Sequence, residues 1–145
     1  MKLVATDYGW LVSIDDCRVQ RIEVDFRLGF LMSDKSGPAS AHIETPCQLG
    51  GEGSDVTLTP ADAPTLCPIL SLFNVEVTGI YIRTTGQLTM AFGNGRSLVV
   101  EPDESYEAWQ IACPGEFLIV CPPGGLVCVY RETEENRQGP ISAGK

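Results

Sequence analysis

Several features that would indicate a specific chemistry are missing from this sequence of 145 residues. His42 is the only histidine, and there is no G-x-S-x-G motif of the kind that carries a nucleophilic serine. The glycine-rich segment 50–54 lacks the lysine of a phosphate-binding loop. No apolar run reaches the roughly 18 residues that a membrane-spanning helix needs. We therefore expect no enzymatic activity, no cofactor and no passage through a membrane.

Basic residues are scarce, with 10 Lys and Arg against 19 Asp and Glu and a formal net charge of −9. The whole acidic excess falls in residues 1–130, because 131–145 holds three residues of each sign. A surface of this sign repels phosphate backbones, so nucleic-acid binding is not expected. It favours a basic partner or a cation, although an acidic surface that only maintains solubility is the alternative.

The beginning of the chain has no apolar core of a secretory signal, since Lys2 and Asp7 fall within the first seven residues. We therefore expect a cytoplasmic protein whose cysteines stay reduced. No C-x-x-C pair is present, so buried thiols are the expectation, no metal site is assigned, and a four-cysteine zinc site is the alternative. The six cysteines are Cys17, Cys47, Cys67, Cys113, Cys121 and Cys128.

One apolar pattern occurs twice. The chain reads V-x-x-I-x-V from Val19 to Val24 and V-x-x-I-x-I from Val77 to Ile82, and glycine-containing turns and further strands follow each copy. This predicts one β-rich domain over residues 1–130 with an internal duplication, at about 10–46 and 75–102. Residues 131–145 have too little apolar content to pack and are expected to be disordered.

The predicted fold is mainly β, with two pseudo-repeated antiparallel β-meanders forming a sandwich or barrel-like sheet. A first short strand is expected at Trp10–Ile14. One long half-buried strand is expected over Val19–Met32, with Phe26 on its apolar face, and a break at Gly29 is the alternative. The glycine-rich segment Gln48–Ser54 is interpreted as a loop. Thr59-Pro60 predicts the start of one short helical segment between the meanders. Further strands are expected at 39–45, 75–83, 87–92, 97–101, 106–112, 116–121 and 126–131.

The densest group of carboxylates follows the second meander. It consists of Glu101, Asp103, Glu104 and Glu107. Their spacing does not match a calcium loop. A solvated turn and a binding edge for a basic protein are the remaining interpretations, and we take Asp103, Glu104 and Glu107 as the candidate partner-binding carboxylates. Trp109 is either a core anchor or an exposed contact, and we add it to the candidate partner-binding residues.

His42 is placed by the alternation of its strand on the same face as Ser40 and Glu44. A solvated histidine on a strand face is the simpler interpretation, because base catalysis needs partners that the sequence does not show. No catalytic residue is assigned.

Residues Gly86–Trp109 carry the pattern G-x-L-x-M-x-F-x-x-G-x-x-L-V-V-E-P-x-x-x-Y-E-A-W, and Gly124-Gly125 follows in a hairpin. This resembles a family of small uncharacterised bacterial proteins, common in actinobacteria, with a C-terminal Y-E-A-W signature at 106–109. Similar signatures occur in immunity proteins of bacterial toxin systems, which are small and act by binding. The resemblance implies an interaction protein whose basic partner is a toxin domain, and it implies no catalytic residues.

Together these features predict a non-catalytic cytoplasmic binding protein of the immunity or inhibitor type, which engages a basic partner protein through an acidic surface. The alternative is a small-molecule-binding β domain with a pocket between the repeats. A homodimer formed through an uncovered sheet edge is compatible with either function.

Overall fold

The computed structural model describes residues 1–51, 53 and 55–132 of the chain. As predicted, the fold is mainly β, with antiparallel strands and one helical segment. None of the helices in this part of the chain has the length and apolar character to cross a membrane. The elements are β1 (Lys2–Thr6), β2 (Gly9–Ser13), β3 (Cys17–Val24), β4 (Leu28–Asp34), β5 (Gly37–Ile43), β6 (Cys47–Gly50), β7 (Val56–Leu58), the 3-10 helix η1 (Ala63–Leu72), β8 (Glu76–Arg83), β9 (Leu88–Phe92), β10 (Ser97–Val100), β11 (Trp109–Cys113), β12 (Phe117–Cys121) and β13 (Cys128–Arg131).

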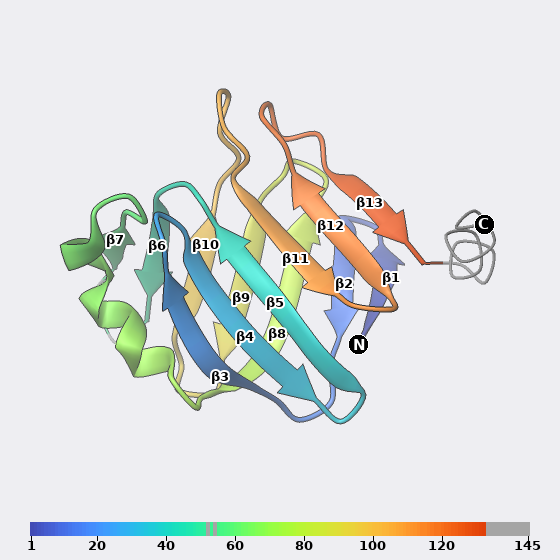
Figure 1. Cartoon of the computed structure of the whole chain (residues 1–145). Helices are drawn as coiled ribbons and strands as arrows, with labels where there is room; N and C mark the ends of the chain where they lie inside the picture. Colours follow the sequence, from blue (N-terminus) through green and yellow to red (C-terminus); the bar gives the residue numbers. More distant parts are fainter. Residues whose placement is uncertain (52, 54, 133–145) are drawn as a thin grey trace, which may run out of the picture.

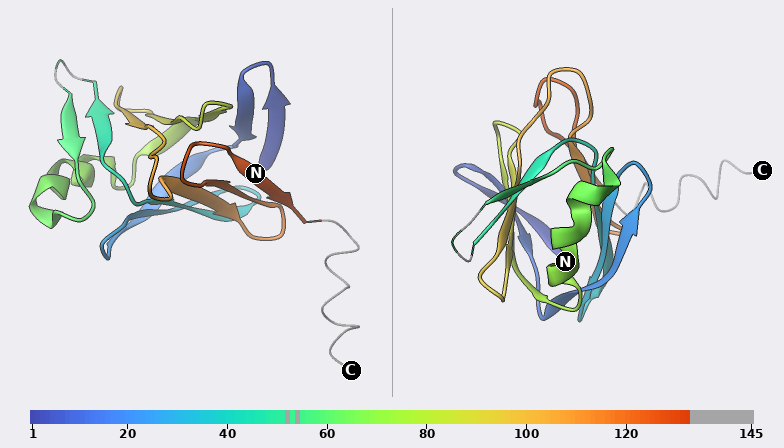
Figure 2. Two further views of the ribbon diagram at one scale, coloured as in Figure 1. Left: turned by 90° about the horizontal axis from the view of Figure 1, so that it is seen from above. Right: turned by 90° about the vertical axis from the view of Figure 1, so that its left-hand side faces the viewer.

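The strands form two layers that face each other across one core (Figures 1 and 2). Along the hydrogen-bonded path the order is β13-β12-β11-β5-β4-β3-β8-β9-β10-β6-β7. The path folds back where β3 meets β8, and there only Cys17 and Arg18 of β3 pair with β8. Its two ends, β7 and β13, do not pair with each other, so the arrangement is a sandwich and not a barrel.

The strand order is pseudo-symmetric about the β3–β8 contact. The meander β3-β4-β5 lies on one side, and the meander β8-β9-β10 on the other. The strand after each meander crosses to the other one, so that β6 pairs with β10 and β11 pairs with β5. Because each half supplies strands to the sheet of the other half, neither half buries its apolar face without its counterpart.

Both meanders carry a register shift at matching places. In the β3–β4 pair it lies between Val19 and Arg21, and in the β8–β9 pair between Val77 and Gly79. An extra residue in a strand moves the next side chain to the opposite face. The bulge therefore explains why the apolar pattern reads V-x-x-I, where regular alternation would give V-x-V.

The single long strand expected over Val19–Met32 is wrong, because the chain turns back between β3 and β4. Phe26 sits in this turn with φ of 66°, and its side chain is 85% exposed instead of core-facing. The Asp25 N–H donates to the Arg27 carbonyl across the turn. A left-handed backbone is uncommon for an aromatic residue, and this turn contains neither Gly nor Asn to announce it.

Two further segments differ from expectation. β1 was not predicted, and it pairs with β2 as a hairpin. Gln48–Gly50 belongs to β6 and not to a loop, because these residues pair with β10. The helical segment is a 3-10 helix with Pro68 inside it, and Asp62, not Thr59, precedes its first residue.

The C-terminal strand β13 ends at Arg131, and the Glu132 N–H still donates to the Glu116 carbonyl at 3.1 Å. Residues 133–145, which form most of the segment expected to be disordered, lie outside the described residues.

The core holds four of the six cysteines as buried thiols. Burial raises the pKa of both Cys17 and Cys47 to about 12, and that of Cys121 to about 11. A thiol with such a pKa is almost entirely protonated at neutral pH and reacts slowly. No group of three or more His, Cys, Asp and Glu side chains is arranged to hold a metal ion within residues 1–51, 53 and 55–132.

The difference in burial among the cysteines predicts a difference in their rates of alkylation. In the native protein at pH 7.5, iodoacetamide is expected to modify Cys67, which is exposed on η1, at least about 100-fold faster than Cys17 or Cys47. After unfolding in guanidinium chloride all three should react at similar rates. Mass spectrometry of timed samples measures the difference, and rapid native labelling at Cys17 would contradict the buried assignment.

Candidate functional site

Two connected segments project together from one end of the sandwich (Figure 1). They are the β10–β11 loop, residues 101–108, and the β12–β13 loop, residues 122–127, and we call them the double loop. The Gly124 N–H donates to the Asp103 carbonyl at 2.8 Å and joins the two segments. Neither segment contains Lys or Arg, whereas the first contains four carboxylates. The double loop is therefore a local concentration of negative charge.

Trp109 anchors the base of the double loop. Its side chain is 0% exposed, and its indole Nε1–H donates to the Gly86 carbonyl at 2.8 Å. Gly86 has φ of 98°, and a Cβ there would lie 2.9 Å from the Gly125 carbonyl oxygen. The glycine is therefore required for the close approach of the β8–β9 turn to the double loop. The expectation that Trp109 contacts a partner is wrong, because its side chain is fully enclosed.

Asp103 shapes the loop as well as carrying charge. Its Oδ1 accepts hydrogen bonds from the backbone N–H groups of Ser105 and Tyr106, at 2.8 and 3.0 Å. An aspartate that binds the backbone two and three residues ahead fixes a tight turn. At the base, the Glu101 carboxylate accepts a hydrogen bond from the Gln87 side chain at 2.5 Å. Glu104 is exposed and makes no such contact within the described residues.

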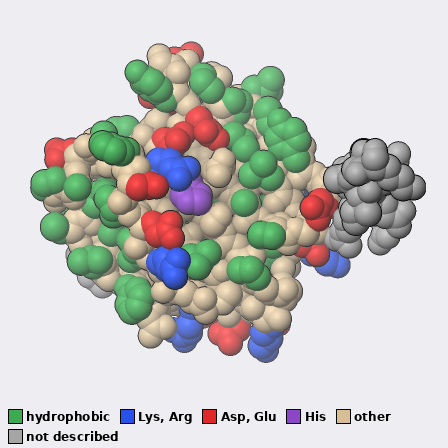
Figure 3. All heavy atoms as spheres, viewed as in Figure 1, with side chains coloured by type: hydrophobic (Ala, Val, Ile, Leu, Met, Phe, Trp, Pro, Cys, Tyr) green, Lys and Arg blue, Asp and Glu red, His purple; other side chains and the backbone are tan. Residues whose placement is uncertain are grey.

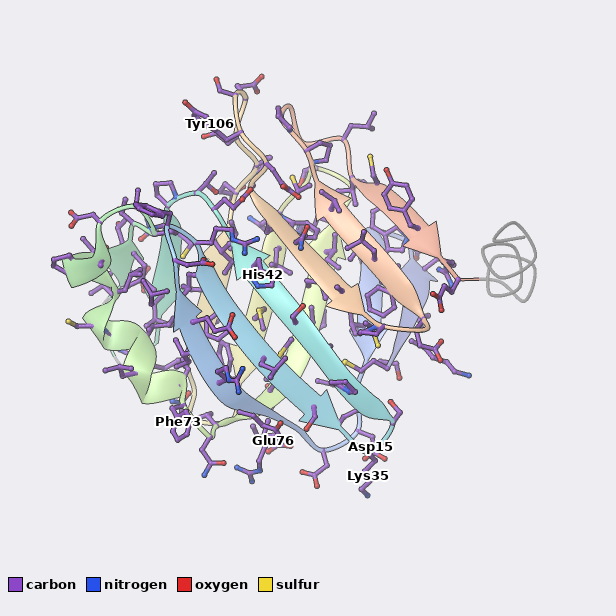
Figure 4. All side chains as sticks on the ribbon, in the orientation of Figure 1. Asp15, Lys35, His42, Phe73, Glu76 and Tyr106 are labelled. Atoms are coloured by element: carbon purple, nitrogen blue, oxygen red, sulfur yellow. The ribbon has the colours of Figure 1, made fainter. Side chains whose placement is uncertain are left out.

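The double loop also presents two large apolar side chains to solvent. Tyr106 is 70% exposed and Leu126 is 80% exposed. Figure 4 shows Tyr106 at the projecting end of the molecule. Sequence reasoning selected Trp109 and passed over Tyr106, although their separation of three positions placed them on opposite faces of a strand. Tyr106 is the aromatic residue that is available for contact.

Glu44 joins the candidate carboxylates from a distant part of the chain. It follows β5 directly, and its N–H donates to the Ala108 carbonyl at 2.9 Å, next to Glu107. Burial, and then the charge and hydrogen-bonding contact of the neighbouring Glu44 carboxylate, raise the pKa of Glu107. Arg27 acts in the opposite direction. Two neighbouring ionised carboxylates repel each other. The cation of a bound partner would therefore relieve a repulsion that is present in the free protein.

His42 lies on the outer face of β5, near the end of the strand (Figure 4). Glu44 follows two residues later, directly after β5. It is half-buried, and its ring packs against Gly29 of β4, where a Cβ would lie 3.1 Å from the His42 Cδ2 atom. Within the described residues its Nδ1 has no hydrogen-bond partner. Acidic and basic side chains surround it on this face (Figure 3).

The raised pKa of Glu107 predicts how the stability of the protein depends on pH. Because the folded-state pKa of Glu107 is raised, the folded protein holds this proton more tightly than the unfolded chain does, and stability falls as pH rises through that pKa. Glu107→Gln should therefore be more stable than the wild type at pH 7, by about 0.5 kcal/mol after solvent screening. The gain should shrink towards pH 4.5. Urea unfolding at several pH values measures it.

Glu104→Gln is the matched control, because Glu104 is exposed on the same loop. It should leave the stability profile unchanged. A Glu107→Gln protein that is less stable than the wild type at pH 7 would show that the carboxylates attract a cation within the fold and do not repel each other.

The comparisons with known proteins identify a family and no activity. The model of a family of unknown function, DUF6188, matches residues 10–131 of the chain. No curated protein and no solved structure matches the chain significantly.

Proposed function

We propose that this chain, which belongs to the DUF6188 family, is a non-catalytic binding protein that engages a basic partner protein through the double loop and the adjoining Glu44. Glu44, Glu104 and Glu107 supply the charge that attracts and orients the partner, and Tyr106 and Leu126 supply apolar contact area. Asp103 holds the loop in shape. This arrangement places an aromatic side chain inside an acidic border, and such anchors dominate the energy of many interfaces.

One observation carries the proposal. Glu44 and Glu107 come from distant parts of the chain, and the pairing of β5 with β11 brings their carboxyl groups together. The nearby Arg27 offsets only part of the effect of burial and of Glu44, because the pKa of Glu107 stays raised. Two neighbouring carboxylates destabilise the free protein, and a Lys or Arg side chain of a partner would remove that cost on binding. The Glu44–Glu107 pair lies at the base of the double loop, which also exposes Tyr106. A partner protein could therefore contact the charged pair and the aromatic side chain together.

The partner fits the immunity or inhibitor type of interaction, in which a small acidic protein covers a basic toxin domain in the cytoplasm. The support for this finer assignment is the net charge of −9 and the Y-E-A-W segment at residues 106–109. In that segment Tyr106 faces solvent and Trp109 anchors the loop, so the segment combines contact and structure.

Affinity capture tests the proposal. The wild-type protein and Tyr106→Ala are immobilised and exposed to lysate of the source organism at low salt, and bound proteins are eluted with increasing salt. We expect a basic protein that is released by salt and that the Tyr106→Ala matrix retains at least about 30-fold more weakly. A partner that is acidic, or that binds both matrices equally, would contradict the proposal.

A further inference from the structure

A groove of about 330 Å³ lies between β8 and the β1–β2 hairpin. In the left view of Figure 2 this hairpin stands at the end of the molecule away from β7. β2 pairs with β8 from Gly9↔Arg83 to Leu11↔Tyr81, so that residues of both elements reach the groove. None of its lining residues belongs to the double loop. The groove is lined chiefly by Thr6, Tyr8, Trp10, Leu11, Tyr81 and Arg83.

The tyrosines of the groove offer flat apolar surfaces. Tyr8 is 75% exposed and Tyr81 is 48% exposed. The Tyr81 ring lies against Gly79 of the same strand, where a Cβ would lie 2.5 Å from the Tyr81 Cε2 and hydroxyl oxygen atoms and 2.6 Å from Cζ. A side chain at position 79 would displace the ring. The glycine therefore allows the Tyr81 ring to lie along the strand while about half of the side chain stays exposed.

The polar groups of the groove are chiefly hydrogen-bond donors. Within the described residues, the Trp10 indole N–H and the Arg83 guanidinium donate to no protein acceptor and form no ion pair. The Thr6 hydroxyl oxygen already accepts hydrogen bonds from the N–H groups of Tyr8 and Gly9. No carboxylate or amide side chain lines the groove. It therefore suits a ligand with many acceptors and a negative charge.

We propose that this groove binds a proline-rich peptide segment that carries an acidic residue. A polyproline II helix has no internal hydrogen bonds, so its carbonyl groups are free to accept from Trp10, the tyrosine hydroxyls and Arg83. Its pyrrolidine rings pack against aromatic side chains, as in other aromatic-lined grooves that recognise such segments. Arg83 selects the acidic residue. A sugar would need acceptors for its hydroxyl protons, and the groove offers few.

The test uses the full chain and three synthetic ten-residue probes. The first repeats Pro-Pro-Glu-Pro-Pro, the second has Lys in place of Glu, and the third is a Gly-Ser repeat. Isothermal titration should show binding of the first at least about tenfold tighter than of the second, and no measurable binding of the third. Tyr8→Ala and Arg83→Ala should each weaken binding of the first probe about tenfold.

Tyr130→Ala is the matched control, because Tyr130 is 59% exposed on β13 and does not line the groove. It should bind the first probe as the wild type does. Thermal melts check that each variant is folded, and Tyr8→Leu replaces Tyr8→Ala if that variant does not fold. Equal affinity for the first and second probes, equal loss in Tyr130→Ala, or groove variants that change only self-association would each overturn the proposal.

Discussion

Reversing the charge of Glu44, Glu104 and Glu107 to lysine is expected to weaken partner binding at least about 100-fold at low salt. Each reversed residue replaces an attraction to a basic partner by a repulsion, and close charge pairs at interfaces are worth about 1.5 kcal/mol or more. Asp103 is left intact because its Oδ1 holds the turn through Ser105 and Tyr106. Titration of the captured partner against each variant measures the effect, and repetition at higher salt should reduce it.

The matched control reverses three exposed carboxylates elsewhere, namely Asp62, Glu76 and Glu116. It has the same change in net charge, so long-range attraction falls equally in both variants. Asp103→Asn is a second control, because an amide oxygen still accepts the two turn hydrogen bonds while the charge is lost. If the control set lost as much affinity as the Glu44 set, binding would depend on overall charge and the double loop would not be the contact surface.

Replacing Trp109 by alanine is expected to destabilise the protein by about 3–5 kcal/mol, because a large and fully buried side chain leaves a cavity. Trp109→Phe should cost less, about 1–3 kcal/mol, since it mainly leaves the Gly86 carbonyl without its hydrogen bond. Urea unfolding followed by circular dichroism measures both. The loss in Trp109→Phe reports chiefly the hydrogen bond to Gly86, and the additional loss in Trp109→Ala reports the packing of the ring.

Tyr106→Ala serves as the contrast, because its side chain is exposed three positions earlier. It should change stability by no more than about 0.5 kcal/mol while it weakens partner binding. Trp109→Phe should show the opposite balance under conditions in which it is fully folded. A Trp109→Phe protein that is as stable as the wild type and fails to bind would return Trp109 to the contact surface.

The alternation of apolar residues was sufficient to predict the two meanders. The V-x-x-I spacing was visible in both copies, but the bulges at Val19 and Val77 that cause it were found only in the structure. The alternation failed as a guide at Phe26, where it continues through a turn. The left-handed backbone at Phe26 has no local sequence signal and is imposed by the pairing of β3 with β4. The exchange of β6 and β11 between the meanders was also outside its reach, because alternation says which face is buried and not which strands pair.

The acidic part of the candidate site was visible in the sequence, since Asp103, Glu104 and Glu107 are close along the chain. Glu44 was not, because only the pairing of Ile43 with Trp109 brings it to Glu107. The choice between Tyr106 and Trp109 depended on which of them faces the core. That choice is decided by the contact between Trp109 and Gly86 of the β8–β9 turn. The two residues are far apart in the sequence, and no local pattern predicts that they meet.

Hydrogen exchange of the isolated complex tests the central claim most directly. The captured partner and the full chain are mixed, exchanged in deuterated buffer and compared with the free chain by mass spectrometry. Binding through the double loop predicts that the largest added protection falls in residues 101–108 and 122–127, with smaller protection around Glu44. Unchanged exchange in both loop segments, with protection confined to other surfaces such as the β1–β2 hairpin, would contradict the claim.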